Sequence, residues 1–140
     1  MDEAQRLIAA LGLFPHPEGG WYRETLRVAG DGRAVVTAIH FLLDAGQRSH
    51  WHTVDATEIW CWHAGSPLWV GCAPADDAAP VWTILGGDVL AGHAPQLTIP
   101  TGHWQAAEAR DGWALVSCVV APGFDFAGFV LAAPGWAPGG

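Results

Sequence analysis

Histidine, glutamate and tryptophan side chains concentrate in one stretch of the chain, HWHTVDATEIWCWHAG, at positions 50–65. His50 and His52 are two residues apart, a spacing that puts both side chains on one face of a strand. The same period puts Glu58, Trp60 and Trp62 on one face of the next segment. Imidazole and carboxylate bind metals and also serve as general acids and bases. The stretch therefore predicts a metal site, a small-molecule pocket with indole walls, or histidines with only a structural role.

The environment of Glu58 makes the pair with His52 chemically interesting. Burial among Trp60 and Trp62 would raise the pKa of the Glu58 carboxyl, and an adjacent His52 would oppose that shift. Such a pair could move a proton or simply hold a ligand.

Nucleophilic catalysis has little support, because no serine lies in a G-x-S-x-G elbow and the three cysteines lie in apolar segments.

Composition limits the classes of function open to the chain. Its 140 residues fit one domain, and 51% of them are hydrophobic. The net charge is −8 and all six cations are arginines, which argues against nucleic-acid binding and rules out lysine Schiff-base chemistry. No apolar run is long enough to cross a membrane, the N-terminus is acidic, and the three cysteines form no C-x-x-C pair. We therefore expect a soluble cytoplasmic protein with no membrane partner.

The segments that must position these side chains are mostly short and β-like. A single helix is expected over 2–12, where Asp2 is a plausible N-cap and Gly12 a stop. Glycine and proline divide the rest into predicted strands at 34–43, 58–63, 67–73, 80–85, 94–100, 104–109, 112–122 and 124–132, beside the strand with His50 and His52. This pattern predicts an all-β sandwich or barrel over about 20–132. The last residues, 133–140, have no periodicity and predict a loose tail.

Two signatures give the chain a resemblance to the cupin superfamily. The first signature, G-x5-H-x-H-x3–4-E-x6-G, matches Gly46, His52, Val54, Glu58 and Gly65, with valine in place of the second histidine. The second signature, P-x-G-x2-H, matches Pro100, Gly102 and Gln105, with glutamine in place of the histidine. Two of the four usual metal ligands, His52 and Glu58, are therefore retained.

Longer blocks make the chain similar to the cupin-5 family in particular. LGLFPHPEGGWYRET, TAIHFLL, SHWHTVDATEIWCWHAGSPL, PQLTIPTGHWQAAEA and VAPGFDFAGFVLA follow the family order from Leu11 to Ala132. The resemblance implies a double-stranded β-helix, or cupin jelly roll, with a short N-terminal helix and a homodimeric assembly. It implies similarity in shape to sugar-nucleotide epimerases and seed-storage barrels, and no specific reaction.

The resemblance also bears on the metal and on the site residues. With two imidazoles lost, we expect no metal cofactor; a retained divalent ion would use His52, Glu58, Gln105 and His50. By analogy with the epimerases, His52 could be a base and Tyr22, the single tyrosine, an acid. The stretch PHPEGGWYRET lies near the barrel opening in the family. Its two glycines predict a tight turn. Its place near the barrel opening makes Glu18 and Arg23 candidates for the rim of the pocket.

These observations lead to one main hypothesis and two alternatives. We expect a barrel that binds a small polar metabolite, sugar- or nucleotide-like, in a largely metal-free pocket. The first alternative is an enzyme, either an epimerase or isomerase or a metal-dependent cupin. The second is a structural or partner-binding barrel. The expected ligand-binding residues are His50, His52, Glu58, Trp60, Trp62, Gln105, Glu18 and Arg23, and the candidate catalytic residues are His52, Glu58 and Tyr22.

Overall fold

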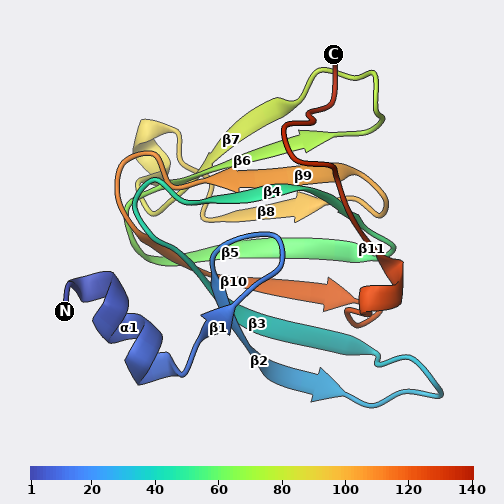
Figure 1. Cartoon of the computed structure of the whole chain (residues 1–140), viewed down its shortest axis with the longest axis horizontal. Helices are drawn as coiled ribbons and strands as arrows, with labels where there is room; N and C mark the ends of the chain where they lie inside the picture. The colour runs from blue at the N-terminus through green and yellow to red at the C-terminus, as the bar shows by residue number, and fades with distance from the viewer.

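One helix precedes the strands in the computed structural model, which describes residues 1–140 (Figure 1). Helix α1 spans Glu3–Leu11, close to the expected bounds of 2–12. The Asp2 side chain accepts a hydrogen bond from the Gln5 amide at 2.8 Å, and Gly12 ends the helix in the left-handed conformation. The apolar side of α1 covers part of the outer face of one sheet, where Ala4 packs near Leu42.

The strands form two antiparallel sheets that face each other (Figure 1). The first sheet has six strands in the order β1-β2-β3-β10-β5-β8, and the second has five in the order β11-β4-β9-β6-β7. Their bounds are β1 (Phe14–Pro15), β2 (Trp21–Val28), β3 (Val36–Leu43), β4 (Arg48–Val54), β5 (Thr57–Gly65), β6 (Leu68–Ala73), β7 (Val81–Leu85), β8 (Gln96–Ile99), β9 (Trp104–Glu108), β10 (Ala114–Ala121) and β11 (Phe129–Leu131). The expected all-β jelly roll with a short N-terminal helix is confirmed.

Two segments differ from the expected strand pattern. Strand β2 was not expected from the sequence, because polar side chains are mixed among its apolar ones and give no regular apolar alternation. The predicted strand over 124–132 is a strand only at β11. A 3₁₀ turn, η2 (Phe126–Gly128), replaces its first half, since the Asp125 carboxylate accepts a hydrogen bond from the Ala127 amide at 3.0 Å.

The core fills only one end of the sandwich. On β10, the inward side chains of Ala114 and Val116 are core residues, whereas Val120 faces a hollow further along the strand. Strand β5 shows the same division, with Trp60 in the core and Glu58 at the hollow. Inward-facing residues of the same strands therefore build both the packed core and the cavity beside it.

A bulge in β4 sets which of its side chains face inward. Ser49 pairs with Ala107 and His52 pairs with Gln105, so two residues of β4 oppose one residue of β9. Ser49 and His52 consequently face the same side, although they are three positions apart. The bulge contradicts the expectation that His50 and His52 share a face. Instead, His50 Nε2 lies 2.9 Å from the Ala133 carbonyl oxygen at the C-terminal segment.

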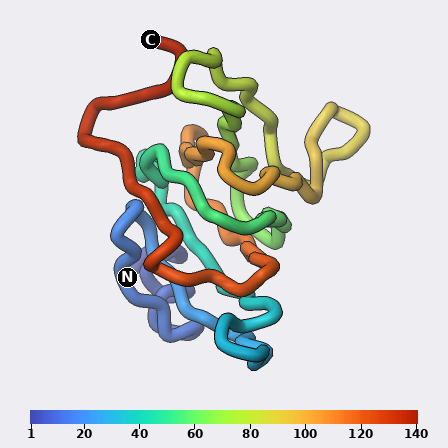
Figure 2. The backbone as a smooth tube through the Cα atoms, turned by 90° about the vertical axis from the view of Figure 1, so that its right-hand side faces the viewer, coloured from blue at the N-terminus to red at the C-terminus, as the bar shows by residue number.

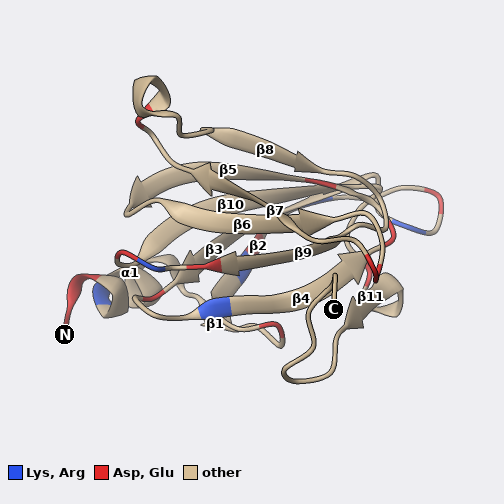
Figure 3. Ribbon diagram, turned by 90° about the horizontal axis from the view of Figure 1, so that it is seen from above, with Lys and Arg blue, Asp and Glu red and all other residues tan.

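Charged residues are sparse along the central strands and gather in loops and at strand ends (Figure 3). This distribution leaves the faces between the two sheets almost free of charge, with the carboxyl groups of the cavity as the exception. No helix is long and apolar enough to cross a membrane.

The C-terminal segment runs along the outside of the barrel instead of forming the expected loose tail (Figure 2). Trp136 packs against Trp104 with ring centroids 4.5 Å apart and planes tilted by 48°, and the Gly139 amide donates to the Asp76 carbonyl at 2.8 Å. Pro138 is buried. The expectation was wrong because apolar contacts and backbone hydrogen bonds hold a segment that has no regular secondary structure.

We predict that Trp136→Ala lowers the free energy of unfolding by about 1–3 kcal/mol, because it removes an aromatic side chain that packs against Trp104. Urea unfolding followed by circular dichroism measures the change. The matched control is Leu90→Ala, at a fully exposed position, which should leave stability within about 0.5 kcal/mol. Equal stability of the Trp136 variant and the control would show that the tail does not support the barrel.

Candidate functional site

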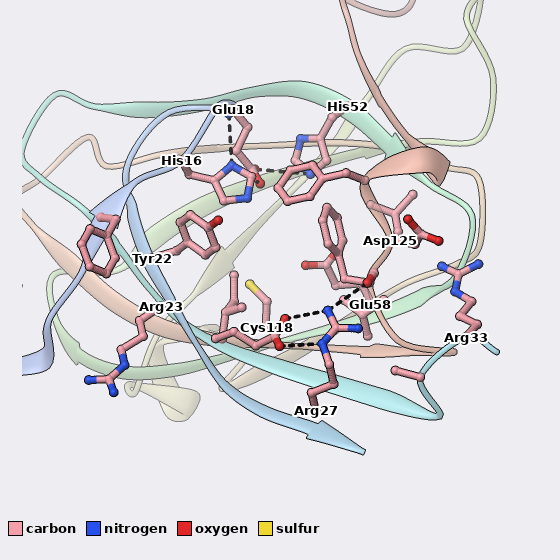
Figure 4. A pocket seen from close by; sticks show the side chains of 18 of the residues that line it. His16, Glu18, Tyr22, Arg23, Arg27, Arg33, His52, Glu58, Cys118 and Asp125 are labelled. Atoms are coloured by element: carbon pink, nitrogen blue, oxygen red, sulfur yellow. Dashed lines mark hydrogen bonds and ion pairs between the residues drawn. The ribbon is translucent and has the colours of Figure 1, made fainter. Parts of the chain in front are cut away.

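A cavity of about 600 Å³ opens at the end of the sandwich that the core leaves unfilled (Figure 4). Its size is within the usual range of small-molecule sites. Polar side chains form its buried floor, which we define as His16, Glu18, His52 and Glu58. Aromatic and aliphatic walls surround the floor; they include Tyr22, Ile39, Val54, Val120, Phe124 and Phe126.

The turn between β1 and β2 carries Glu18 into this cavity. Gly19 and Gly20 both have positive φ, at 110° and 78°. A Cβ on Gly19 would collide with the carbonyl oxygen of Arg48, so the turn lies tightly against the start of β4. The His50 amide donates to the Glu18 carbonyl at 2.7 Å and fixes this approach. The two glycines therefore form the expected turn, and the turn positions a functional carboxyl.

Glu18 contacts three polar side chains inside the cavity. Its Oε2 accepts a hydrogen bond from the Ser49 hydroxyl and lies 3.3 Å from His52 Nε2. Its Oε1 lies 3.2 Å from His16 Nδ1. Ser49 and His52 reach the same carboxyl because of the bulge in β4. The side chains of His16, Glu18 and His52 are each at least nine-tenths buried.

Backbone contacts determine how the two histidines present their ring nitrogens. The Glu18 amide donates to His16 Nδ1 at 3.1 Å, which makes that nitrogen an acceptor and leaves the proton of neutral His16 on Nε2. His52 has the opposite arrangement, since its Nδ1 lies 2.7 Å from the His50 carbonyl oxygen and must donate to it. The Nε2 of neutral His52 is therefore a proton acceptor directed at Glu18.

A hydrogen-bonded chain behind the floor supports Glu58. The Trp60 indole donates to Gln105 Oε1 at 2.8 Å, and Gln105 Nε2 donates to Glu58 Oε1 at 3.0 Å. An indole can only donate, so Trp60 fixes the orientation of the Gln105 amide. Gln105 and Trp60 thus lie one step behind the cavity and act on it through Glu58.

Burial shifts the acid–base behaviour of the floor. Desolvation raises the pKa of Glu18 to about 8 against the opposing hydrogen bond from Ser49. Desolvation also raises the pKa of Glu58 to about 7; His52 opposes this rise, in agreement with the expectation from sequence. Burial, with His52 nearby, lowers the pKa of His16 to about 4, and burial likewise lowers the pKa of His52. Near neutral pH, Glu18 and both histidines therefore favour their neutral forms, while Glu58 is close to the midpoint between its neutral and ionised forms.

Three arginines surround the mouth of the cavity, and each already has a partner. Arg27 makes a bidentate pair with Glu24 at 2.8 and 2.9 Å. Arg33 pairs with Asp55 and donates to the Gly123 carbonyl at 2.7 Å. The guanidinium of Arg23 points away from the cavity in Figure 4, with Nη1 3.4 Å from the Leu11 carbonyl oxygen.

The structure brings some of the predicted site residues together and separates others. Glu18, Tyr22, Arg23, His52 and Glu58 line the cavity. His50, Trp60, Trp62 and Gln105 do not line it. His50 turns outward at the bulge. The Trp62 indole donates to the Ser66 carbonyl at 3.0 Å, at the packed end of β5.

Several cavity residues were not expected from the sequence. His16 was not among the expected site residues, yet it lies on the floor and contacts both Glu18 and the Tyr22 ring; the ring centroids of His16 and Tyr22 are 4.5 Å apart. The His-x-Glu spacing of His16 and Glu18 was the available signal. Cys118 lines the cavity beside Glu58, and burial raises its pKa well above the ordinary value. It lies in an apolar run and gave no signal.

The residues at the superfamily's metal positions do not fit a metal ion. Val54 has no donor atom, and the oxygen of Gln105 is occupied by the Trp60 indole. The Gln105 amide instead turns its NH₂ group toward Glu58. No group of three or more His, Cys, Asp or Glu side chains is arranged to hold a metal. His52 and Glu58 alone fall short of the three or more donors typical of protein metal sites.

We predict that the protein loses stability as the pH rises from 6.5 to 8. The pKa of Glu18 is about 8 in the folded protein and near 4.5 when unfolded, so its stabilising contribution is complete below 4.5 and lost as pH rises through 8. Glu58 also stabilises the folded protein less as the pH rises, and its contribution is lost as the pH passes about 7. The contribution of His16 is lost only as pH falls from 6.5 through 4, outside this window.

Glu18→Gln removes one of these titrations while keeping an acceptor for Ser49. Between pH 6.5 and 8 the free energy of unfolding of the unsubstituted protein should fall by at least about 1 kcal/mol, since one pKa unit corresponds to about 1.4 kcal/mol. The fall should be clearly smaller in Glu18→Gln, and unchanged in Glu24→Gln at the mouth. Parallel pH profiles for Glu18→Gln and the unsubstituted protein would contradict the buried acid.

Comparison with solved structures gives two similar proteins of nearly the same length. A protein from Shewanella oneidensis is 36% identical, with 95% of this chain and 86% of that chain covered and a TM-score of 0.87. A hypothetical protein from Leishmania major is 31% identical, with coverages of 94% and 88% and a TM-score of 0.85. No functionally curated protein matches the chain.

More distant structures share the fold alone. Oxalate oxidase in complex with the substrate analogue glycolate is 18% identical over 84% of this chain and 57% of that chain, with a TM-score of 0.62. Oxalate decarboxylase from Bacillus subtilis is 15% identical over 84% of this chain and 29% of that chain, with a TM-score of 0.65.

The family model Cupin_5, described as cupin superfamily (DUF985), matches residues 5–132. The chain therefore belongs to the Cupin_5 family of the cupin superfamily.

Proposed function

We propose that the protein binds a small polar metabolite in the cavity without a metal ion. The observation that carries the proposal is the floor itself, where two carboxyls and two imidazoles converge on a hollow of about 600 Å³. Buried polar groups are costly unless they are satisfied, so a structural barrel would gain stability by filling this space with apolar side chains. A ligand that exchanges hydrogen bonds with the floor explains why it is polar.

The binding set differs from the one expected from sequence. Glu18, His52 and Glu58 are its polar groups, and His16 joins them. Gln105 and Trp60 support Glu58 from behind. Tyr22 supplies a hydroxyl that points into the cavity in Figure 4. A sugar- or nucleotide-like molecule is compatible with these donors and acceptors, and the aromatic walls would pack against its less polar face.

Native mass spectrometry of untagged protein, at low collision energy, tests this proposal. We expect a small adduct on the folded chain that disappears under denaturing conditions. The adduct should be absent from Ile39→Trp, which fills the cavity from its apolar wall, and present on Val81→Thr, at an exposed position on β7. Extracts of small metabolites added to stripped protein provide the ligand if purification removes it. An adduct retained by Ile39→Trp, or no binding from any extract, would overturn the proposal.

Absence of a metal ion is a separate part of the proposal with its own test. We predict far less than one zinc, iron, manganese or nickel per chain by elemental analysis of protein purified without an affinity tag. The double variant Val54→His with Gln105→His restores the superfamily's ligand types and should bind added divalent metal more tightly than the unsubstituted chain. One metal per unsubstituted chain would contradict the proposal and favour a metal-dependent enzyme.

Proton transfer to or from the bound metabolite is a second candidate function. It is favoured by the geometry of His52, whose Nδ1 is held by the His50 carbonyl while Nε2, 3.3 Å from Glu18 Oε2, is the ring's proton acceptor. Tyr22 could supply an acid from the opposite wall, as the epimerase analogy suggests. If the bound metabolite gains deuterium on carbon in D₂O, and His52→Asn abolishes this exchange, the protein is an enzyme of the epimerase or isomerase type.

The proposal includes a homodimer in the cytoplasm. Strand β1 covers only the start of β2, which leaves the outer edge of β2 free beyond it. Leu26 and Val28 are exposed along that part of β2. A second copy could pair there and extend the six-stranded sheet. Three free cysteines are compatible with a reducing compartment.

A further inference from the structure

The cavity floor carries two buried carboxyls without a permanent cation beside them. Glu18 approaches from the turn before β2, and Glu58 from β5. The groups that face them are His16 from the same turn, His52 from β4, Gln105 from β9, Cys118 from β10 and Tyr22 from β2. None of these side chains carries a fixed positive charge.

The arginines do not supply the missing cation. Arg27 and Arg33 lie at the mouth, and each is held by a carboxylate of its own, Glu24 and Asp55. Arg23 points away toward α1 (Figure 4). The chain as a whole has a net charge of −8. An anionic ligand would meet two carboxyls at the floor and no free cation on the way in.

The walls are suited to a positively charged group. Tyr22, Phe124 and Phe126 line the cavity, and Phe129 packs against Phe126 with ring centroids 6.0 Å apart. The faces of aromatic rings attract ammonium groups, most strongly where water is excluded. Carboxyls at the bottom and aromatic rings around them are together the two features by which proteins hold organic amines.

We propose that the metabolite bound in the cavity is an organic amine, whose ammonium group lies between Glu18 and Glu58. This inference rests on the proposed function and narrows its ligand to a chemical class. The ammonium N–H groups would donate to the two carboxyls, and the ligand's less polar body would lie against the aromatic walls toward the mouth. An amino sugar or an arylalkylamine satisfies these requirements, and a dicarboxylate does not.

A series of three molecules of nearly the same shape tests the charge preference. Phenethylamine, 2-phenylethanol and phenylacetate are positive, neutral and negative at pH 7. We expect calorimetric titration in 150 mM salt to give at least tenfold tighter binding of the amine than of the alcohol, and no measurable binding of the acid. Equal or tighter binding of the alcohol or the acid would overturn the proposal.

Three variants locate the preference in the floor. Glu18→Gln and Glu58→Gln should each reduce affinity for the amine at least fivefold while changing affinity for the alcohol less than twofold. Glu3→Gln removes an exposed carboxyl of α1 that does not line the cavity, and should leave both affinities within twofold. Thermal unfolding confirms that each variant is folded. If only one of the two floor variants folds, its affinities alone are enough to test the proposal. An unchanged amine preference in the floor variants would overturn the proposal.

The outcomes also separate this inference from the proposed function. A metabolite adduct on the purified chain, with no amine preference in the series, leaves a binding cavity for another chemical class and overturns the amine proposal alone. Absence of binding by all three probes, together with absence of any adduct, overturns both.

Discussion

Two carboxyl groups lie inside this barrel, where an isolated charge would be strongly destabilising. Polar contacts from the surrounding strands and turns offset the cost of burying them. Glu18 is supported by Ser49, His16 and His52, and Glu58 by Gln105. Each support depends on a particular backbone feature. The bulge in β4 turns Ser49 and His52 to one side, and the glycine turn brings Glu18 to meet them. Removing any of these features would leave a buried carboxyl without its partners, which is why the floor is best understood as one unit.

The same constraint accounts for the division of the barrel into a packed end and a hollow end. The strands continue across both ends with their two-residue alternation, so the difference lies in side-chain type alone. Inward positions are filled by large apolar residues such as Phe41 and Trp60 at one end and by shorter or polar ones such as Val120 and Glu58 at the other. The cavity therefore needs no separate domain, because it forms at the end of the sandwich where large apolar side chains no longer fill the space between the sheets.

The sequence predicted the fold class, the helix and most strands, because apolar alternation and glycine or proline breaks are local signals. It also identified five residues that line the cavity. His50 was misjudged because a bulge is a property of the pairing between β4 and β9, which the sequence of β4 alone does not reveal. His16 and Cys118 were missed for a related reason: their role arises from contacts with strands distant in sequence. The two tryptophans predicted to line the cavity lie behind it or beyond it, since strand periodicity gives the face of a residue but not its distance along the barrel.

The replacement of two metal ligands changes the chemistry that the remaining residues can perform. In a site with three imidazoles and a carboxylate, the metal would supply the positive charge that balances Glu58. Here Val54 contributes only apolar surface, and Gln105 turns a neutral NH₂ group toward that carboxyl. Burial then raises the pKa of Glu58 and of Glu18 instead of leaving them ionised beside a cation. The two carboxyls then have no cation to balance their ionised forms, and an ammonium ligand of the proposed kind would favour those forms and lower both pKa values again.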